Sequence, residues 1–171
     1  EHPVTEAVTG PARAAWHWAV AEGKPLPRTR GEAVLRGHTV EARLYAEDVG
    51  AGFLPASGPI QWLHWPQGVR IDTGVAAGDE VSPYYDPMIA KLVVHGQSRA
   101  EAFARLADAL AALSLGPLVH NGPLLLRLCE EPDVLAMAHH TQWPIPTESL
   151  ATPTLAWPLA TLWLASRTGP S

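Results

Sequence analysis

Apolar and polar side chains alternate along residues 39–46, which read TVEARLYA. A period of two is typical of a strand with one face buried and the other open. The pattern therefore predicts a half-buried strand over 39–46, with Glu41 and Arg43 on its open face. The apolar side of this strand consists of Val40, Ala42, Leu44 and Ala46.

A helical period replaces this alternation over residues 99–115. Ser98 and Glu101 form a capping box at the start of the segment, and Gly116-Pro117 stops it. We therefore expect a helix that begins at 99 and runs to 115. Its apolar positions, spaced three and four apart, are Phe103, Leu106, Leu110 and Leu113.

Two further helices and three further strands complete the pattern. A helix over 4–22 ends at Gly23, and one over 122–130 ends before Pro132. Several strands with helices at each end, and no alternation of strand and helix, predict an α+β fold. The remaining strands are expected at 60–65, 69–73 and 88–95, with turn-rich loops at 48–58 and 79–87.

Composition narrows the classes of function. The 171 residues carry a net charge of −5 and no basic stripe, which argues against nucleic acid and anionic membrane surfaces as partners. No apolar run reaches the roughly 20 residues that span a bilayer. The single cysteine, Cys129, excludes a disulfide framework and suggests a reducing compartment. It lies on an apolar helix beside acidic residues, which predicts a buried, unreactive thiol.

The eight histidines do not form a metal motif. His139 and His140 are adjacent, and adjacent residues cannot share one helix face. With one cysteine and no H-x-x-x-H spacing in the sequence, we expect no metal bound by this chain itself.

Four segments, in order and in register, resemble the C-terminal third of biotin carboxylase. The resemblance implies the C-terminal domain of that family, a small antiparallel sheet with flanking helices, preceded by the tail of an ATP-grasp domain. The segments are EHPVTE (1–6), RGHTVEARLYAED (36–48), GFLPASG (52–58) and SPYYDPMIAK (82–91).

The resemblance also implies a division of the chain. Residues 1–30 would end the ATP-grasp portion, 31–150 would form the C-terminal domain, and 151–171 would be a linker and the start of a truncated following domain. The chain begins at an acid that closes a longer active-site run in the family. The ATP-grasp portion would therefore precede Glu1 in a parent protein, and the chain alone would be inactive.

The family's reaction gives roles to two residues. ATP, with Mg²⁺, activates bicarbonate to carboxyphosphate, which delivers carbon dioxide to a ureido nitrogen of biotin. Glu1 matches the base that deprotonates bicarbonate, and Arg43 matches the guanidinium that stabilises the biotin enolate. The magnesium ligands would lie upstream of this chain. Without the resemblance, Glu1 is a solvated terminal residue, and Arg43 is half of an ion pair with an acid such as Glu41.

Three more residues are candidates with open alternatives. Tyr85 and Asp86 would support Arg43 from behind, although a turn-forming Asp86 is an equal reading. Trp143, in HTQWPIP (140–146), occupies the family's adenine-contacting position. A tryptophan packed in the core is its rival interpretation.

The partners implied by the resemblance are a biotin carboxyl carrier domain, a carboxyltransferase subunit and a second copy in a homodimer. The compartment would be the cytoplasm in a bacterium or the mitochondrion in a eukaryote. A non-catalytic scaffold or dimerisation module derived from the same domain is the alternative function.

Overall fold

The computed structural model describes residues 2–10, 13–26 and 34–147. Glu1 and the segment 151–171 lie outside the described residues, so their predicted roles are not addressed by it. Within the described ranges, no helix combines the length and the apolar character needed to cross a membrane.

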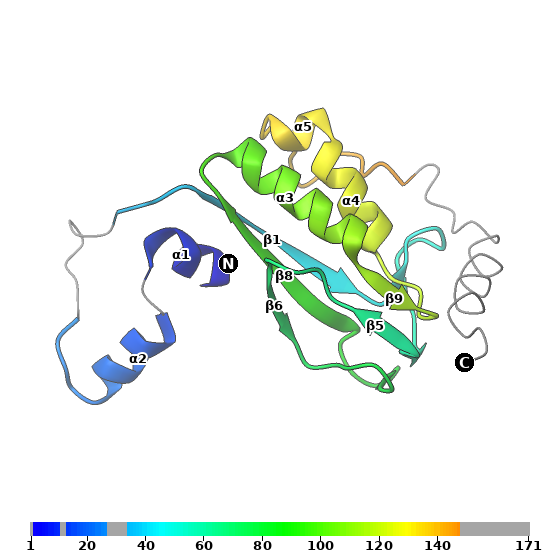
Figure 1. Cartoon of the computed structure of the whole chain (residues 1–171), viewed down its shortest axis with the longest axis horizontal. Helices are drawn as coiled ribbons and strands as arrows, with labels where there is room; N and C mark the ends of the chain where they lie inside the picture. Colours follow the sequence, from blue (N-terminus) through cyan, green and yellow to red (C-terminus); the bar gives the residue numbers. More distant parts are fainter. Residues whose placement is uncertain (1, 11–12, 27–33, 148–171) are drawn as a thin grey trace, which may run out of the picture.

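A three-stranded antiparallel sheet forms the centre of the molecule (Figure 1). The central strand is β8 (Met88–Gly96), which pairs with β1 (His38–Tyr45) on one side and β6 (Arg70–Thr73) on the other. Long, nearly continuous burial along β8 is what a strand covered on both faces requires. The predicted strands at 39–46, 69–73 and 88–95 are thereby confirmed within one or two residues.

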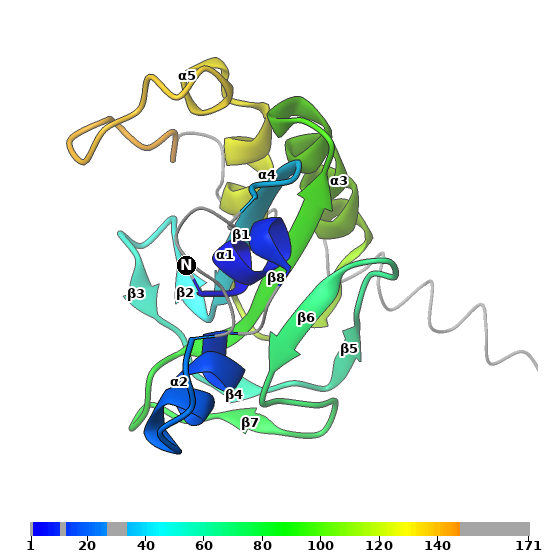
Figure 2. The same ribbon diagram turned by 90° about the vertical axis from the view of Figure 1, so that its left-hand side faces the viewer.

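Helices cover the two faces of this sheet unequally (Figure 2). α3 (Arg99–Ala112) packs against β8 and β1 on one face, and α4 (Gly122–Glu130) packs beside it. α1 (His2–Thr9) contacts the same two strands from the other face. We call these the α3 face and the α1 face of the sheet.

The hydrophobic core lies on the α3 face. The alternation along β1 sends Ala42 and Leu44 into it, where they are 5% and 0% exposed, while Arg43 stays exposed. The predicted apolar stripe of α3 supplies the opposing layer, since Phe103, Leu106 and Leu110 are all buried. The predicted division of β1 therefore holds at Ala42, Arg43 and Leu44, but it is wrong for Thr39, which is buried on the side predicted to be open, and Glu41 is half-buried there. The α+β prediction is confirmed.

The remaining strands form short two-stranded antiparallel ladders. The predicted strand at 60–65 is confirmed in part as β5, and the loops at 48–58 and 79–87 contain brief strands that the prediction missed. These ladders pair β2 (Glu47–Asp48) with β3 (Leu54–Pro55), β4 (Gly58–Pro59) with β7 (Glu80–Val81), and β5 (Trp62–His64) with β9 (Ser114–Gly116).

The single helix predicted over 4–22 is wrong, because two helices occupy that range. α1 ends at Thr9, and Gly10 follows with a φ of 90°, a backbone conformation that favours glycine. α2 (Arg13–Ala21) then begins, with the amide of Arg13 donating to Glu6 Oε1 at 2.9 Å. α2 buries none of its residues, and Trp18 is 71% exposed.

The start of α3 follows the prediction and its end does not. Ser98 Oγ accepts from the Glu101 amide at 3.2 Å, and Glu101 Oε2 accepts from the Gln97 amide at 2.8 Å. The helix stops at Ala112, three residues early. Residues 114–116 pair with β5 instead, where Gly116 lies directly against the Trp62 ring.

α4 matches the predicted helix over 122–130. The chain then turns at Pro132 into α5 (Pro132–Leu135), as the expected stop requires. Arg99 fastens this short helix to α3: its Nη2 donates to Val134 O at 2.7 Å and its Nε donates to Leu135 O at 3.1 Å.

Candidate active site

Arg43 projects from the α1 face of a strand whose backbone is held on both edges. On one edge β8 pairs with β1 throughout its length. On the other, Asn121 Nδ2 donates to Arg43 O at 3.3 Å and Asn121 Oδ1 accepts from Tyr45 N at 2.9 Å. A guanidinium on such a strand has a fixed starting point, which suits it for binding a small anion.

The guanidinium of Arg43 lies 5.9 Å from the centroid of the Tyr45 ring, within cation–π range. The alternative partner, Glu41, forms no ion pair with it in the described part of the chain. Glu41 Oε2 is instead buried with no hydrogen-bond partner among the described residues. Glu41 is the carboxylate nearest to Arg43 along the strand, and it does not pair with the Arg43 guanidinium.

A row of charges crosses the α1 face at this level. Arg43 on β1 lies opposite Lys91 on β8, which in turn lies opposite Asp72 on β6. Arg70 holds Asp72 with two bonds, Nε to Oδ1 at 3.0 Å and Nη2 to Oδ2 at 2.9 Å. These bonds lower the pKa of Asp72, with a smaller contribution in the same direction from the charge of Lys91.

α1 is attached to this row through one ion pair. Arg70 Nη1 lies 3.5 Å from Glu6 Oε2, in the middle of the helix that follows Glu1 in sequence. Glu6, the last residue of the EHPVTE segment, therefore fixes this segment to the face that carries Arg43.

The loop with Tyr85 and Asp86 leads into β8 beside the end of β1. It is bonded there, since Ala46 N donates to Pro87 O at 2.8 Å. Asp86 Oδ1 accepts from Met88 N at 2.8 Å, which is the bond of a turn-forming aspartate, and Tyr85 is 83% exposed. No described contact joins either side chain to Arg43, so their support of Arg43 stays a prediction.

Trp143 lies with the helical layer. Its Nε1 donates to Asp133 Oδ2 at 2.9 Å, and the His139 ring stands edge-on to it at 6.5 Å between centroids. The indole is half-buried and packs against the edge of the core. Both interpretations of Trp143 fit this position, because one side of the ring packs inward while the residue keeps exposed surface.

Cys129 is buried in α4, as predicted. Burial is the main cause that raises the pKa of its thiol to about 11, and the charge of Glu130 adds to it. A thiol with this pKa is almost entirely protonated near neutral pH, so it is a poor nucleophile. Across the described ranges, no cluster of three or more histidine, cysteine, aspartate or glutamate side chains is arranged to hold a metal ion.

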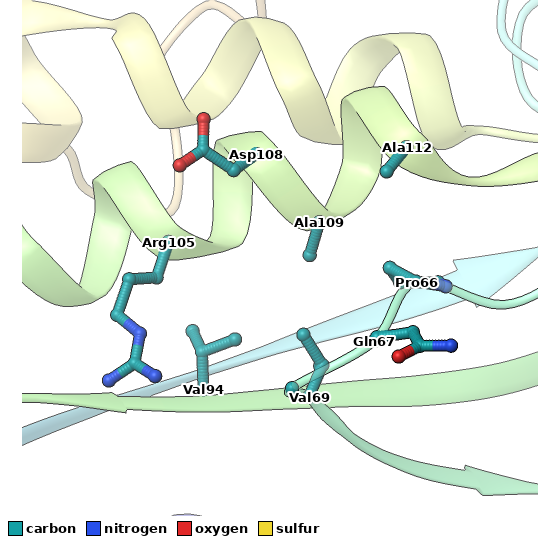
Figure 3. A pocket seen from close by; sticks show the side chains of 9 residues that line it. Pro66, Gln67, Val69, Val94, Arg105, Asp108, Ala109 and Ala112 are labelled. Carbon is teal, nitrogen blue, oxygen red and sulfur yellow. The ribbon is translucent and has the colours of Figure 1, made fainter.

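A pocket of about 250 Å³ lies on the α3 face, away from Arg43 (Figure 3). Arg105 and Asp108 of α3 flank it above, and Val69 and Val94 form its floor. Arg105 already donates to His95 O at 2.7 Å. The pocket therefore does not extend the charged row, which lies on the other side of the sheet.

Asn121 is the site residue that the sequence analysis missed. It is 7% exposed, and it directly precedes α4, where an asparagine would ordinarily cap the helix. Its side chain makes no cap hydrogen bond and bonds to β1 instead. Its place before a predicted helix was visible in the sequence, but its partner 76 residues away was not.

Comparison with known proteins identifies this arrangement. The family model described as the biotin carboxylase C-terminal domain matches residues 41–144, which include β8, Asn121 and the part of β1 that carries Arg43. The chain belongs to the biotin carboxylase C-terminal domain family. The resemblance carried by the four sequence segments is therefore confirmed.

Relatives place the domain within larger proteins. Methylcrotonoyl-CoA carboxylase subunit alpha, mitochondrial, from Glycine max is 47% identical over 130 residues, which are 75% of this chain and 18% of that protein. Biotin carboxylase from Halalkalibacterium halodurans is 39% identical over 134 residues, 77% of this chain and 29% of that protein. The chain thus spans less than a third of the length of either relative.

Solved structures share the fold. The biotin carboxylase domain dimer of the Hydrogenobacter thermophilus 2-oxoglutarate carboxylase, in complex with MgADP, ADP and bicarbonate, matches with a TM-score of 0.81 and 32% identity, over 84% of this chain and 32% of that one. A Campylobacter jejuni biotin carboxylase in complex with β,γ-ATP matches with a TM-score of 0.79 and 34% identity, over 84% and 32%. The α+β architecture described above is that of the biotin carboxylase C-terminal domain.

Proposed function

We propose that this chain supplies part of the active site of an ATP-dependent biotin carboxylase, a ligase that carboxylates biotin on a carrier domain. The observation that supports the proposal is the setting of Arg43. Its guanidinium leaves a strand that is fixed on both edges, and no described carboxylate pairs with it. The resemblance assigns this position to the guanidinium that stabilises the biotin enolate.

The chemistry requires a cation at this point. Biotin's ureido nitrogen is a weak nucleophile, and its deprotonated form places negative charge on the ureido oxygen. A guanidinium is always charged and offers forked donors, so it stabilises that oxygen without reorganising. Arg43 would lower the energy of the enolate and leave the binding of ATP unaffected.

The other roles rest on the resemblance alone. Glu1 would be the base that deprotonates bicarbonate, and Trp143 would contact the adenine of ATP. Tyr85 and Asp86 would support the biotin end of the site. The magnesium ligands would belong to the ATP-grasp portion, as the resemblance implies.

The chain covers only part of the length of its relatives, which suggests that it contains only some of the domains of the full enzyme. We propose that 1–30 belongs to the ATP-grasp portion and 31–150 to the C-terminal domain, with 151–171 leading into a following domain. The full enzyme would work with a carrier domain, a carboxyltransferase and a second copy of itself. Its compartment would be the bacterial cytoplasm or the mitochondrion, and the relative from Glycine max is named as mitochondrial.

The test uses the intact carboxylase that contains this segment. Arg43→Ala should lower biotin carboxylation by about 100- to 1,000-fold, the usual cost of removing one donor to an oxyanion. The affinity for ATP should stay unchanged. An equal loss of both would refute the role of Arg43, and full activity would favour the scaffold alternative. The 171-residue chain alone should show no bicarbonate-dependent ATP hydrolysis, and measurable turnover would contradict its dependence on an ATP-grasp portion.

A further inference from the structure

Two cations stand directly opposite each other on the α1 face. Arg43 and Lys91 are partners in the β1–β8 register and point to the same side of the sheet. Directly opposed residues of an antiparallel pair have Cβ atoms about 5 Å apart, and like charges at that spacing destabilise the pair. Such a pair needs a counter-charge or a function.

Among the described residues, no neighbouring acid forms a contact ion pair with either cation, although the charge of Lys91 acts on Asp72. Asp72, across from Lys91 on β6, already gives both carboxylate oxygens to Arg70. Neither Arg43 nor Lys91 forms an ion pair with any residue that the structure describes. The two charges are therefore unmatched at contact distance within the described ranges.

Lys91 can be reached by a ligand. A hollow of about 310 Å³ lies beside it, lined also by Asp72 and Met88, which is the lower end of the size range of small-molecule sites. The Lys91 side chain is half-buried, and its backbone is fixed in β8 between two strands. The backbone from which the Lys91 side chain extends is therefore held as firmly as that of Arg43.

We propose that Lys91 is a second cationic ligand of the Arg43 site. The ammonium and the guanidinium hold one small oxyanion between them, and this rests on the proposed function, in which the oxyanion is the ureido oxygen of biotin. Arginine contributes a forked donor and lysine a compact point charge, so the two are complementary around one oxygen. Lys91 adds no covalent step; it stabilises the charge that develops when the ureido nitrogen is deprotonated.

The competing role for Lys91 is to balance Asp72. In that role Lys91 would affect the stability of the β6–β8 pair, and its loss would not change the kinetics for biotin specifically. The ligand role predicts a change in kcat/KM for biotin, and the balancing role predicts a change in stability, so kinetic measurements separate the two.

The experiment compares variants of the intact carboxylase that contains this segment, with free biotin as the probe. Lys91→Met removes the charge and keeps the length, Lys91→Arg keeps the charge, and Lys24→Met removes a surface charge on the helix end, where Lys24 pairs with Glu22. Lys91→Met should lower kcat/KM for biotin by about 10- to 100-fold. Lys91→Arg should recover most of this, and Lys24→Met should have no effect. The two Lys91 variants should change ATP hydrolysis without biotin far less than they change biotin carboxylation, and Lys24→Met should leave both at the wild-type rate.

The other outcomes separate the two proposals. Normal biotin carboxylation by Lys91→Met, with a large loss in Arg43→Met, would overturn the role of Lys91 and leave that of Arg43. No loss in either variant would overturn the proposed function itself. If Lys91→Met lowers Tm and all activities together, Asp72→Asn combined with Lys91→Met decides. Recovered carboxylation in the double variant would mean that Lys91 only balances Asp72, and carboxylation that stays low in a recovered fold would support the ligand role.

Discussion

The side chain of Asn121 takes the place of a missing strand beside Tyr45. Its Oδ1 accepts from Tyr45 N at 2.9 Å, its Nδ2 donates to Arg43 O at 3.3 Å, and the backbone N–H of Asn121 donates to Tyr45 O at 3.0 Å. β1 lies at the edge of the three-stranded sheet, where backbone groups would otherwise lack partners. The loop before α4 therefore completes the strand that carries Arg43.

Replacing Asn121 with alanine should destabilise the domain. The change removes two hydrogen bonds and leaves backbone groups of Arg43 and Tyr45 unpaired, which costs about 2–4 kcal/mol of the free energy of unfolding. Asn121→Asp keeps an acceptor for Tyr45 N but places a carboxylate oxygen against Arg43 O in a buried position, so it should also destabilise the domain. Urea denaturation of the three proteins measures the difference. Equal stability of all three would mean that the two bonds contribute nothing.

Gly116 should not tolerate a side chain. A Cβ at this position would overlap the Trp62 ring, so Gly116→Ala should cost about 1–3 kcal/mol by overpacking the β5–β9 ladder. Gly74→Ala is the matched control, because its Cβ would meet no atom within 4 Å. Thermal unfolding followed by tryptophan fluorescence should show a lowered Tm for the first variant only. A similar Tm for both would contradict the close packing of Gly116 and Trp62.

His120 should make the fold sensitive to acid. Burial lowers the pKa of its side chain from the usual 6.5, against the opposing effect of a backbone hydrogen bond with Leu115. Because the folded pKa lies below the unfolded one, the stability from neutral His120 is complete above the unfolded pKa. It falls as pH drops below that value, by at most about 1.4 kcal/mol per pH unit, until the folded pKa is reached.

The variant His120→Asn isolates this effect. An asparagine oxygen can accept from the Gly122 amide, as His120 Nδ1 does at 3.1 Å, but it does not titrate. Denaturation at a series of pH values should show a shallower acid loss in this variant than in the wild type, while all other histidines are common to both. Parallel curves would show that His120 is not the group responsible.

The thiol of Cys129 should be nearly inert in the folded chain. Its pKa is raised from the usual 9.0 to about 11, which lowers the thiolate fraction at pH 8 by about 100-fold through the pKa alone. Reaction with a colorimetric disulfide reagent should be slow in buffer and fast in urea. Equal rates in both would show that the α4 thiol is open to solvent.

The main elements of the fold were predictable because each has a local cause. The alternation along β1 and the capping box of Ser98 depend only on neighbours in sequence, and both predictions held, the first of them at Ala42, Arg43 and Leu44. The errors came where distant contacts decide. The helical pattern of α3 extends to residue 115, but pairing with β5 and the fit of Gly116 on Trp62 draw residues 114–116 into a ladder.

The site divides in the same way. Arg43 was predictable from a motif and from its place on the open face of a strand. Asn121 was not, because its hydrogen-bond partners lie 76 and 78 residues away. The opposition of Arg43 and Lys91 likewise depends on a strand register that no local pattern determines.

The strand order β1-β8-β6 also has a consequence for how the domain folds. Neither outer strand can pair until the chain has closed a loop onto β8, and the loop to β1 is the longer of the two, since Arg43 must meet Lys91. Closing a long loop is slow, because its entropy cost comes before the stabilising contacts between the strands have formed. The pairing that brings Arg43 opposite Lys91 is therefore expected to form later than the local helix α3 and the shorter β6–β8 closure.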